Sequence, residues 1–168
     1  LKDLQYSVMF KERGNIYHDG LLFAYKKSVF EVLDTKILDF NKGHAYEHSF
    51  EYKKCNVAIS AYLFHKKSGR RLYLIGTHLY WDPKLEHVKY LQMSQILKHI
   101  YSNMTPDDII VWGGDLNSKP YGNLVRYVVE KSKPLESLME CRDRNRFQVL
   151  KDIFKDLQSM NADQVHLY

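Results

Sequence analysis

The fold is decided by the stretch CNVAISAYLFHKKSGRRLYLIGTHLYWDP, residues 55–83. Small or apolar residues alternate along Cys55–Phe64, and an apolar run, Arg71–Thr77, follows the turn-forming Lys66–Gly69. Every second residue of a strand points to the same side, so this pattern predicts a β-hairpin. The residues of the first run that share one face are Val57, Ile59, Ala61 and Leu63. The returning run and Ile109–Gly113 are continuously apolar, which predicts central strands covered on both faces.

Upstream of this stretch the sequence predicts another hairpin and a long loop. Two short apolar runs, Gly20–Tyr25 and Val29–Leu33, flank the polar Lys26–Ser28. This arrangement is typical of two strands joined by a turn. Asn41–Lys54 is polar and rich in His and Tyr, so we predict a surface loop there.

Helices are predicted downstream. Asp82 is a favourable N-cap, Pro83 fits the first helical position, and apolar residues follow at helical spacing as far as Tyr101. Apolar patterns also predict helices at Asn123–Lys131 and Phe147–Met160. Strands in hairpins, with helices between others, indicate a layered α/β fold.

The overall composition allows several classes of partner. The 168 residues are 45% hydrophobic, which is enough for one ordinary domain with a core. No apolar stretch is long enough to cross a membrane, and the two cysteines lack metal-binding spacing, which favours reduced thiols. The net charge of +5 is compatible with a polyanionic partner such as nucleic acid. Some of the 13 tyrosines and eight phenylalanines are candidates for stacking on single-stranded bases, although most are expected in the core.

Polar side chains follow two of the predicted central strands, which we predict to be neighbours in one sheet with His78 and Asp115 at the same end. His78 follows the strand at residues 71–77, and Asp115 and Asn117 follow the strand at residues 109–113. In an extended chain Asp115 and Asn117 point to the same side, where a carboxylate and an amide can orient a water and stabilise charge on a phosphoryl oxygen. A carboxylate is also a ligand that Mg²⁺ accepts, and His78 can donate a hydrogen bond to a phosphate oxygen.

Each of these residues also has an ordinary structural explanation. An Asp-x-Asn sequence after a strand is commonly an Asx turn, and a lone His at a strand end is commonly a hydrogen-bonded structural residue. Gly113 and Gly114 leave room beside Asp115 for a ligand to approach the backbone. The residues alone therefore indicate a candidate site for handling a phosphoryl group.

Three blocks of the sequence together resemble the endonuclease/exonuclease/phosphatase superfamily. Gly114–Ser118, followed by Pro120, is similar to its GDxNS-x-P signature. Thr77–Pro83 is similar to its second motif in the form used by carbon-catabolite-repression-type deadenylases, nocturnin and angel proteins. The stretch from Asp19 to Asn41 resembles the upstream "DG-strand-K…F…EFN" block. The resemblance implies part of a four-layer α/β sandwich of two packed mixed sheets flanked by helices, as in DNase I.

The resemblance also implies an activity and roles for four residues. It implies a Mg²⁺-dependent phosphodiesterase, with Mn²⁺ as an alternative ion, acting as a 3′–5′ exoribonuclease on poly(A) or other single-stranded RNA 3′ ends. Asp115 would activate the attacking water or share in holding Mg²⁺, Asn117 would contact the phosphate and transition state, and His78 would hydrogen-bond the scissile phosphate. Pro83 would lie against the substrate base. RNA is the implied partner, with no membrane, and the implied location is intracellular: cytoplasm, with nucleus and mitochondrion as alternatives.

The sequence departs from the family at both ends. The family's principal Mg²⁺ ligand is a Glu on an LQE strand, which has no equivalent before Tyr6, and no SDH segment follows Asp115. We therefore expect residues 1–168 to be a single, incomplete domain that is inactive on its own. The alternatives are a non-catalytic fragment or pseudoenzyme that binds RNA or a protein partner and, within the superfamily, a DNA-repair endonuclease or a nucleotide or phosphoinositide phosphatase. Glu12 and Arg13 are further site candidates, although their spacing differs from that of the family.

Overall fold

The computed structural model describes residues 5–14, 18–42, 52–130 and 155. The chain divides into two compact units. The first, here called the strand unit, takes Leu1–His78 and Asp107–Asp115, and the second, the helical unit, takes Leu79–Pro106 and Leu116–Tyr168. The prediction of one domain over residues 1–168 stays a prediction.

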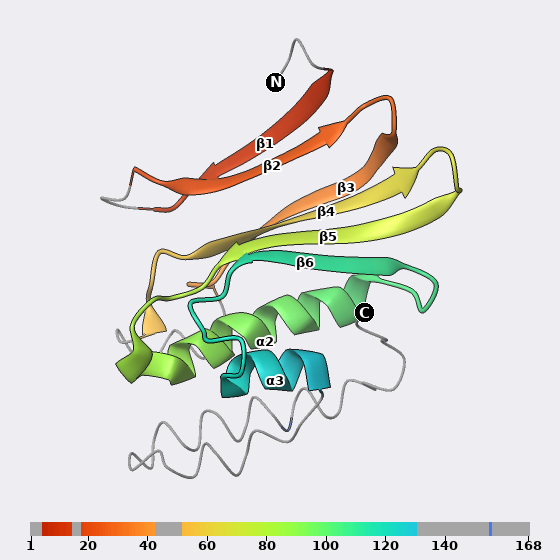
Figure 1. Ribbon diagram of the computed structural model, residues 1–168. Helices are drawn as coiled ribbons and strands as arrows, with labels where there is room; N and C mark the ends of the chain where they lie inside the picture. Colours follow the sequence, from red (N-terminus) through yellow and green to blue (C-terminus); the bar gives the residue numbers. More distant parts are fainter. Residues whose placement is uncertain (1–4, 15–17, 43–51, 131–154, 156–168) are drawn as a thin grey trace. The chain divides into compact units, whose positions relative to one another are not determined.

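Six strands make up the described part of the strand unit (Figure 1). They are β1 (Tyr6–Glu12), β2 (Gly20–Lys26), β3 (Phe30–Asp39), β4 (Val57–His65), β5 (Arg70–His78) and β6 (Ile109–Asp115). β1 and β2 form a two-stranded antiparallel sheet, and the other four form a sheet in the order β3-β4-β5-β6. This second sheet is mixed, because β5 and β6 run parallel while its other pairs are antiparallel.

The hairpin predicted at residues 55–77 is confirmed. β4 and β5 pair from Ala58 opposite Thr77 to His65 opposite Arg70. At the turn between them Gly69 has a φ of 70°, a left-handed conformation that glycine adopts without strain. Its backbone N–H donates to the His65 carbonyl at 2.9 Å, which closes the turn.

The upstream hairpin prediction is wrong. β2 pairs with β1 and β3 pairs with β4, so the two predicted partners lie in different sheets. β2 instead turns one face, which carries the half-buried Phe23, toward β4 and β5. The Phe23 ring lies over Gly76 of β5, where the missing side chain leaves space for it. Packing between sheets, rather than the local turn signal, decides the place of β2.

The predicted covering on both faces holds for β5 but not for β6. β4 is also buried on both faces along most of its length. The face opposite Ile59 carries the small residues Ala58 and Ser60, both buried. β6 is the last strand of the described sheet, and Val111 at its centre is 48% exposed, so within the described residues it is not covered on both faces.

The described helical unit contains η2 (Pro83–Leu85), α2 (Glu86–Asn103) and α3 (Asn123–Glu130). The predicted cap is confirmed, because Asp82 Oδ1 accepts a hydrogen bond from the Lys84 backbone N–H at 2.8 Å and Pro83 takes the first position. The segment begins as a 3₁₀ turn before the α-helix starts. The helix predicted at residues 147–160 and most of the predicted loop at 41–54 lie outside the described residues. None of the described helices combines the length and apolar character needed to cross a membrane.

A partly buried tyrosine is expected to make the free energy of unfolding depend on pH in the alkaline range. Burial raises the pKa of Tyr127, on α3, to about 12, from an ordinary value of 10.0. The folded state therefore keeps a proton that the unfolded state loses between these two values. The stabilising contribution of the neutral hydroxyl is fully present below pH 10 and is lost as the pH rises toward 12.

We predict that the free energy of unfolding falls as the pH rises above 10, and that Tyr127→Phe makes this fall less steep. Urea unfolding at several pH values between 8 and 11.5 measures it. The matched control is Tyr121→Phe, because Tyr121 is 90% exposed and its hydroxyl meets water in both states. An identical slope for wild type and Tyr127→Phe would show that this hydroxyl titrates alike in both states.

Candidate active site

The last residues of the two parallel strands are direct neighbours. His78 ends β5 and Asp115 ends β6, and they are register partners in the sheet. Side chains at paired positions of neighbouring strands point to the same face. His78 is half-buried and Asp115 is exposed. The prediction that these strands are neighbours, with their polar residues at the same end, is confirmed.

Gly114 brings the two strands together at this end. Its φ is 124°, and a side chain there would collide with the backbone oxygen of Thr77. The space predicted for a ligand at Gly114 is therefore taken by the backbone of β5. Gly113, by contrast, has open space where its side chain would be. Only glycine allows the approach that sets Asp115 beside His78.

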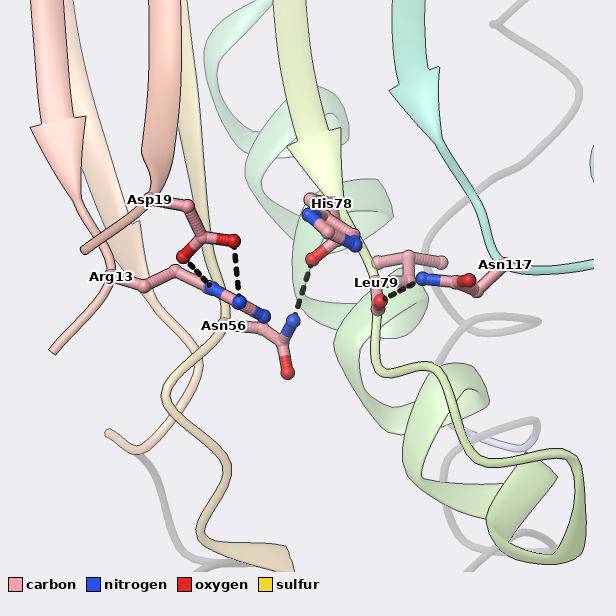
Figure 2. A network of polar contacts seen from close by, with 6 residues as sticks. All are labelled: Arg13, Asp19, Asn56, His78, Leu79 and Asn117. Carbon is pink, nitrogen blue, oxygen red and sulfur yellow. Dashed lines mark hydrogen bonds and ion pairs between the residues drawn. The ribbon is translucent and has the colours of Figure 1, made fainter. Parts of the chain in front are cut away.

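An ion pair joins the ends of β1 and β2 (Figure 2). Arg13 Nε donates to Asp19 Oδ1 at 2.7 Å, and a second guanidinium nitrogen donates to Oδ2 at 2.5 Å. This guanidinium holds the pKa of the Asp19 carboxyl below its ordinary value. Two of the guanidinium nitrogens of Arg13 thus bind Asp19, and this ion pair links the end of β1 to the start of β2.

Asn56 holds the end of β5 in place. The ladder between β4 and β5 stops at Ala58 and Thr77. One step beyond, the buried side-chain amide of Asn56 donates to the His78 carbonyl at 2.8 Å, as Figure 2 shows. The amide extends the ladder by one bond and fixes the backbone that carries the imidazole. Sequence reasoning missed Asn56, and its only signal is a polar residue directly before an apolar strand.

Asn117 belongs to the helical unit, unlike His78 and Asp115. Its φ is 48°, so the backbone is left-handed, and the alternation expected for an extended Asp-x-Asn does not apply. The prediction that Asp115 and Asn117 point to one side as strand neighbours is therefore wrong. Asn117 Nδ2 donates to the Leu79 carbonyl at 2.8 Å (Figure 2).

The helical unit, which begins directly after His78 in sequence, carries exposed apolar side chains in its first residues. Pro83 is exposed at the first position of η2, and Trp81 is 62% exposed. The Trp81 ring leans against Tyr80, with centroids 6.1 Å apart. An exposed indole beside an exposed proline is suited to contact a flat, apolar group such as a nucleobase.

The residues of the site suit Mg²⁺ in kind but not in number. The Asp115 carboxylate is a hard oxygen ligand of the type that Mg²⁺ prefers. Within the described ranges, however, no three His, Cys, Asp or Glu side chains gather closely enough to hold a metal ion. An ion bound through one carboxylate keeps most of its waters, so these residues alone do not build a complete Mg²⁺ site.

Comparison with known proteins supports the same fold and family. No protein-family profile matches the chain. The chain is 34% identical over 117 residues to the CCR4-Not complex 3′-5′-exoribonuclease subunit Ccr4 of Candida glabrata, covering 60% of this chain. It is 26% identical over 137 residues to human 2′,5′-phosphodiesterase 12, covering 70% of this chain. The crystal structure of ANGEL2, a 2′,3′-cyclic phosphatase, bound to adenosine-2′,3′-vanadate matches 77% of this chain at 25% identity, with a TM-score of 0.68.

These likenesses confirm the predicted fold. The two sheets and their helices are those of the DNase I-like α/β sandwich. The chain spans 13% of the Ccr4 protein, 22% of the 2′,5′-phosphodiesterase and 37% of the ANGEL2 chain. The similarity therefore concerns a part of each relative.

Proposed function

We propose that the chain, which is similar to proteins of the carbon-catabolite-repression-type branch of the endonuclease/exonuclease/phosphatase superfamily, is part of a Mg²⁺-dependent phosphodiesterase that shortens RNA from the 3′ end. Poly(A) is the proposed substrate, and an intracellular location is part of the proposal. The observation that carries it is the pairing of His78 with Asp115 at the ends of β5 and β6. A carboxylate and an imidazole on one face are groups that phosphoryl transfer uses.

Each site residue has a role that its surroundings support. The exposed Asp115 carboxylate would accept a proton from the attacking water. The His78 imidazole would donate to a non-bridging oxygen of the scissile phosphate, and its position is fixed through Asn56. The Asn117 amide would donate to the phosphate as negative charge builds up in the transition state.

Three observations favour an RNA 3′ end as the substrate. The Ccr4 relative is named a 3′-5′-exoribonuclease, and the ANGEL2 structure holds an adenosine derivative. Trp81 and Pro83 are exposed in the segment that follows His78 in sequence and offer an apolar surface that a nucleobase could contact. The net charge of +5 favours a polyanion.

The likeness to ANGEL2 gives a second candidate, a phosphatase acting on a nucleotide or on a terminal phosphate. The phosphate group of its substrate would be terminal, whereas the exoribonuclease would cleave a phosphodiester that joins two nucleosides. A phosphoinositide substrate has no base for Trp81 and Pro83 to contact.

A single assay separates these functions. The protein containing this chain is incubated with Mg²⁺ and a 5′-labelled RNA that carries 20 adenosines at its 3′ end. The exoribonuclease gives a ladder that shortens from the 3′ end and releases 5′-AMP. A phosphatase leaves this RNA intact but releases phosphate from the same RNA with a 3′-terminal phosphate. Cleavage inside a circular RNA of the same sequence would contradict the proposal, and so would binding without any product.

We predict that Pro83→Ala raises KM for the adenosine-tailed RNA by up to about tenfold, and by a larger factor than it lowers kcat, which should fall less than threefold. The proline would contact the base and not the reacting phosphate, so its loss weakens binding more than the chemical step. The measurement compares kcat and KM on adenosine-tailed and uridine-tailed RNA, because the preference for adenosine should also fall. Pro106→Ala, at another exposed proline of the same unit, is the matched control. A loss confined to kcat would contradict the base-contact role.

A further inference from the structure

Two polar residues are buried on one side of helix α2. Lys89 is 3% exposed and Gln92 is 0% exposed. They are three residues apart, so they lie on the same face of the helix. Lysine and glutamine are seldom buried to this degree, because their polar ends lose water unless protein groups replace it.

Both buried side chains bind the segments that follow β5 and β6. Gln92 Oε1 accepts from the Tyr80 backbone N–H at 2.9 Å, and Lys89 Nζ donates to the Asn117 carbonyl at 2.8 Å. The amide of Asn117 in turn donates to the Leu79 carbonyl at 2.8 Å. These three bonds link helix α2, the segment starting at Leu79 and the segment around Asn117, all within the helical unit.

The linked segments are covalent continuations of the candidate active site. Leu79 directly follows His78, and Asn117 follows Asp115 by two residues. Asn117 is left-handed, a conformation that asparagine adopts more readily than most residues other than glycine. The bond from Lys89 to the Asn117 carbonyl and the bond from the Asn117 amide to Leu79 hold this residue on both sides.

We propose that Lys89 and Gln92 are positioning residues, which fix the segments after His78 and Asp115 and aim the Asn117 amide. This loop clamp, made of Lys89, Gln92 and the bonds described above, does not touch the substrate. It acts through Asn117 and through the backbone at Tyr80. The inference rests on the proposed function for its kinetic consequence, but the clamp itself is a structural arrangement that can be tested separately.

The kinetic test uses Lys89→Met in the protein that contains this chain, with Lys98→Met on the same helix as the matched control. Methionine keeps the length and the apolar stem of lysine and removes the ammonium group. Lys89→Met is expected to lower kcat on adenosine-tailed RNA at least about tenfold with KM changed less than threefold, because small misplacements of reacting groups are costly. Lys98→Met is expected to stay within twofold of wild type.

A double variant separates positioning from a general loss of stability. If Lys89 acts through Asn117, then adding Lys89→Met to Asn117→Ala slows the enzyme no further, since the aimed amide is already gone. A residue that only stabilises the fold would lower the rate by the same factor in both backgrounds. Multiplying effects, or a Lys89→Met enzyme within twofold of wild type, would overturn the proposal.

Hydrogen exchange tests the clamp without any turnover. The Tyr80 amide, which donates to Gln92, is expected to exchange slowly in wild type and at least tenfold faster in Gln92→Met and in Lys89→Met, but not in Lys98→Met. Unchanged protection in Gln92→Met would overturn the clamp even if the protein cleaves RNA. Lost protection in a protein that cleaves no RNA would support the clamp and reject the proposed function.

Discussion

Asp115→Ala is expected to lower the turnover of RNA by at least about 100-fold, because a positioned general base contributes roughly two to four orders of magnitude to such reactions. Asp115 is exposed at the end of β6, so its replacement should change the free energy of unfolding little. Asn117→Ala is expected to have an effect of similar size, since it removes a donor aimed at the developing negative charge. Initial rates on adenosine-tailed RNA measure both.

The matched control for Asp115→Ala is Asp107→Ala. Asp107 is exposed and lies just before the start of β6, at the opposite end of the strand from Asp115. Asp107→Ala also removes one carboxylate and one negative charge from the strand unit, and it should leave the rate within twofold of wild type. Near-normal turnover in Asp115→Ala, or equal losses in both variants, would show that the end of β6 beside His78 has no special part in the reaction.

Removing divalent metal is expected to lower the rate of RNA shortening by at least about 100-fold. Metal ions stabilise the charge on a transferred phosphoryl group, and few side chains can take over this role. Treatment with EDTA followed by dialysis into metal-free buffer tests this. Mg²⁺ added back should restore the rate, with Mn²⁺ as the alternative ion. An enzyme that keeps its full rate in EDTA would refute the Mg²⁺ dependence while leaving the assignment of His78 and Asp115 to be tested by their variants.

The features that the sequence predicted correctly depend on short-range signals. The β4–β5 hairpin follows from alternating residues around a Lys66–Gly69 turn, and the start of η2 follows from Asp82 and Pro83. The neighbouring ends of β5 and β6 were predicted because both strands are apolar and both are followed by polar residues. These signals lie within a few residues of the feature that they predict.

The features that the sequence did not reveal depend on contacts far along the chain. β2 belongs to a different sheet from the predicted one, and the packing of Phe23 on Gly76 favours this position. The left-handed Asn117 is held by Lys89 and Leu79, which lie 28 and 38 positions away. Because Lys89 is charged, its sequence context predicts a solvent-exposed side chain. Its burial is explained by the position of its acceptor, the Asn117 carbonyl.

We propose that the ends of β5 and β6 handle the phosphate of an RNA 3′ end. The most direct test is a titration of the protein with 5′-AMP, the expected product, in the presence of Mg²⁺, followed by the ¹H–¹⁵N shifts of its backbone amides. We expect the largest changes at residues 76–80 and 113–118 and none at the Lys66–Gly69 turn, which lies at the opposite end of β5. Largest changes at that turn, or no change at residues 76–80 and 113–118 at millimolar AMP, would contradict this proposal.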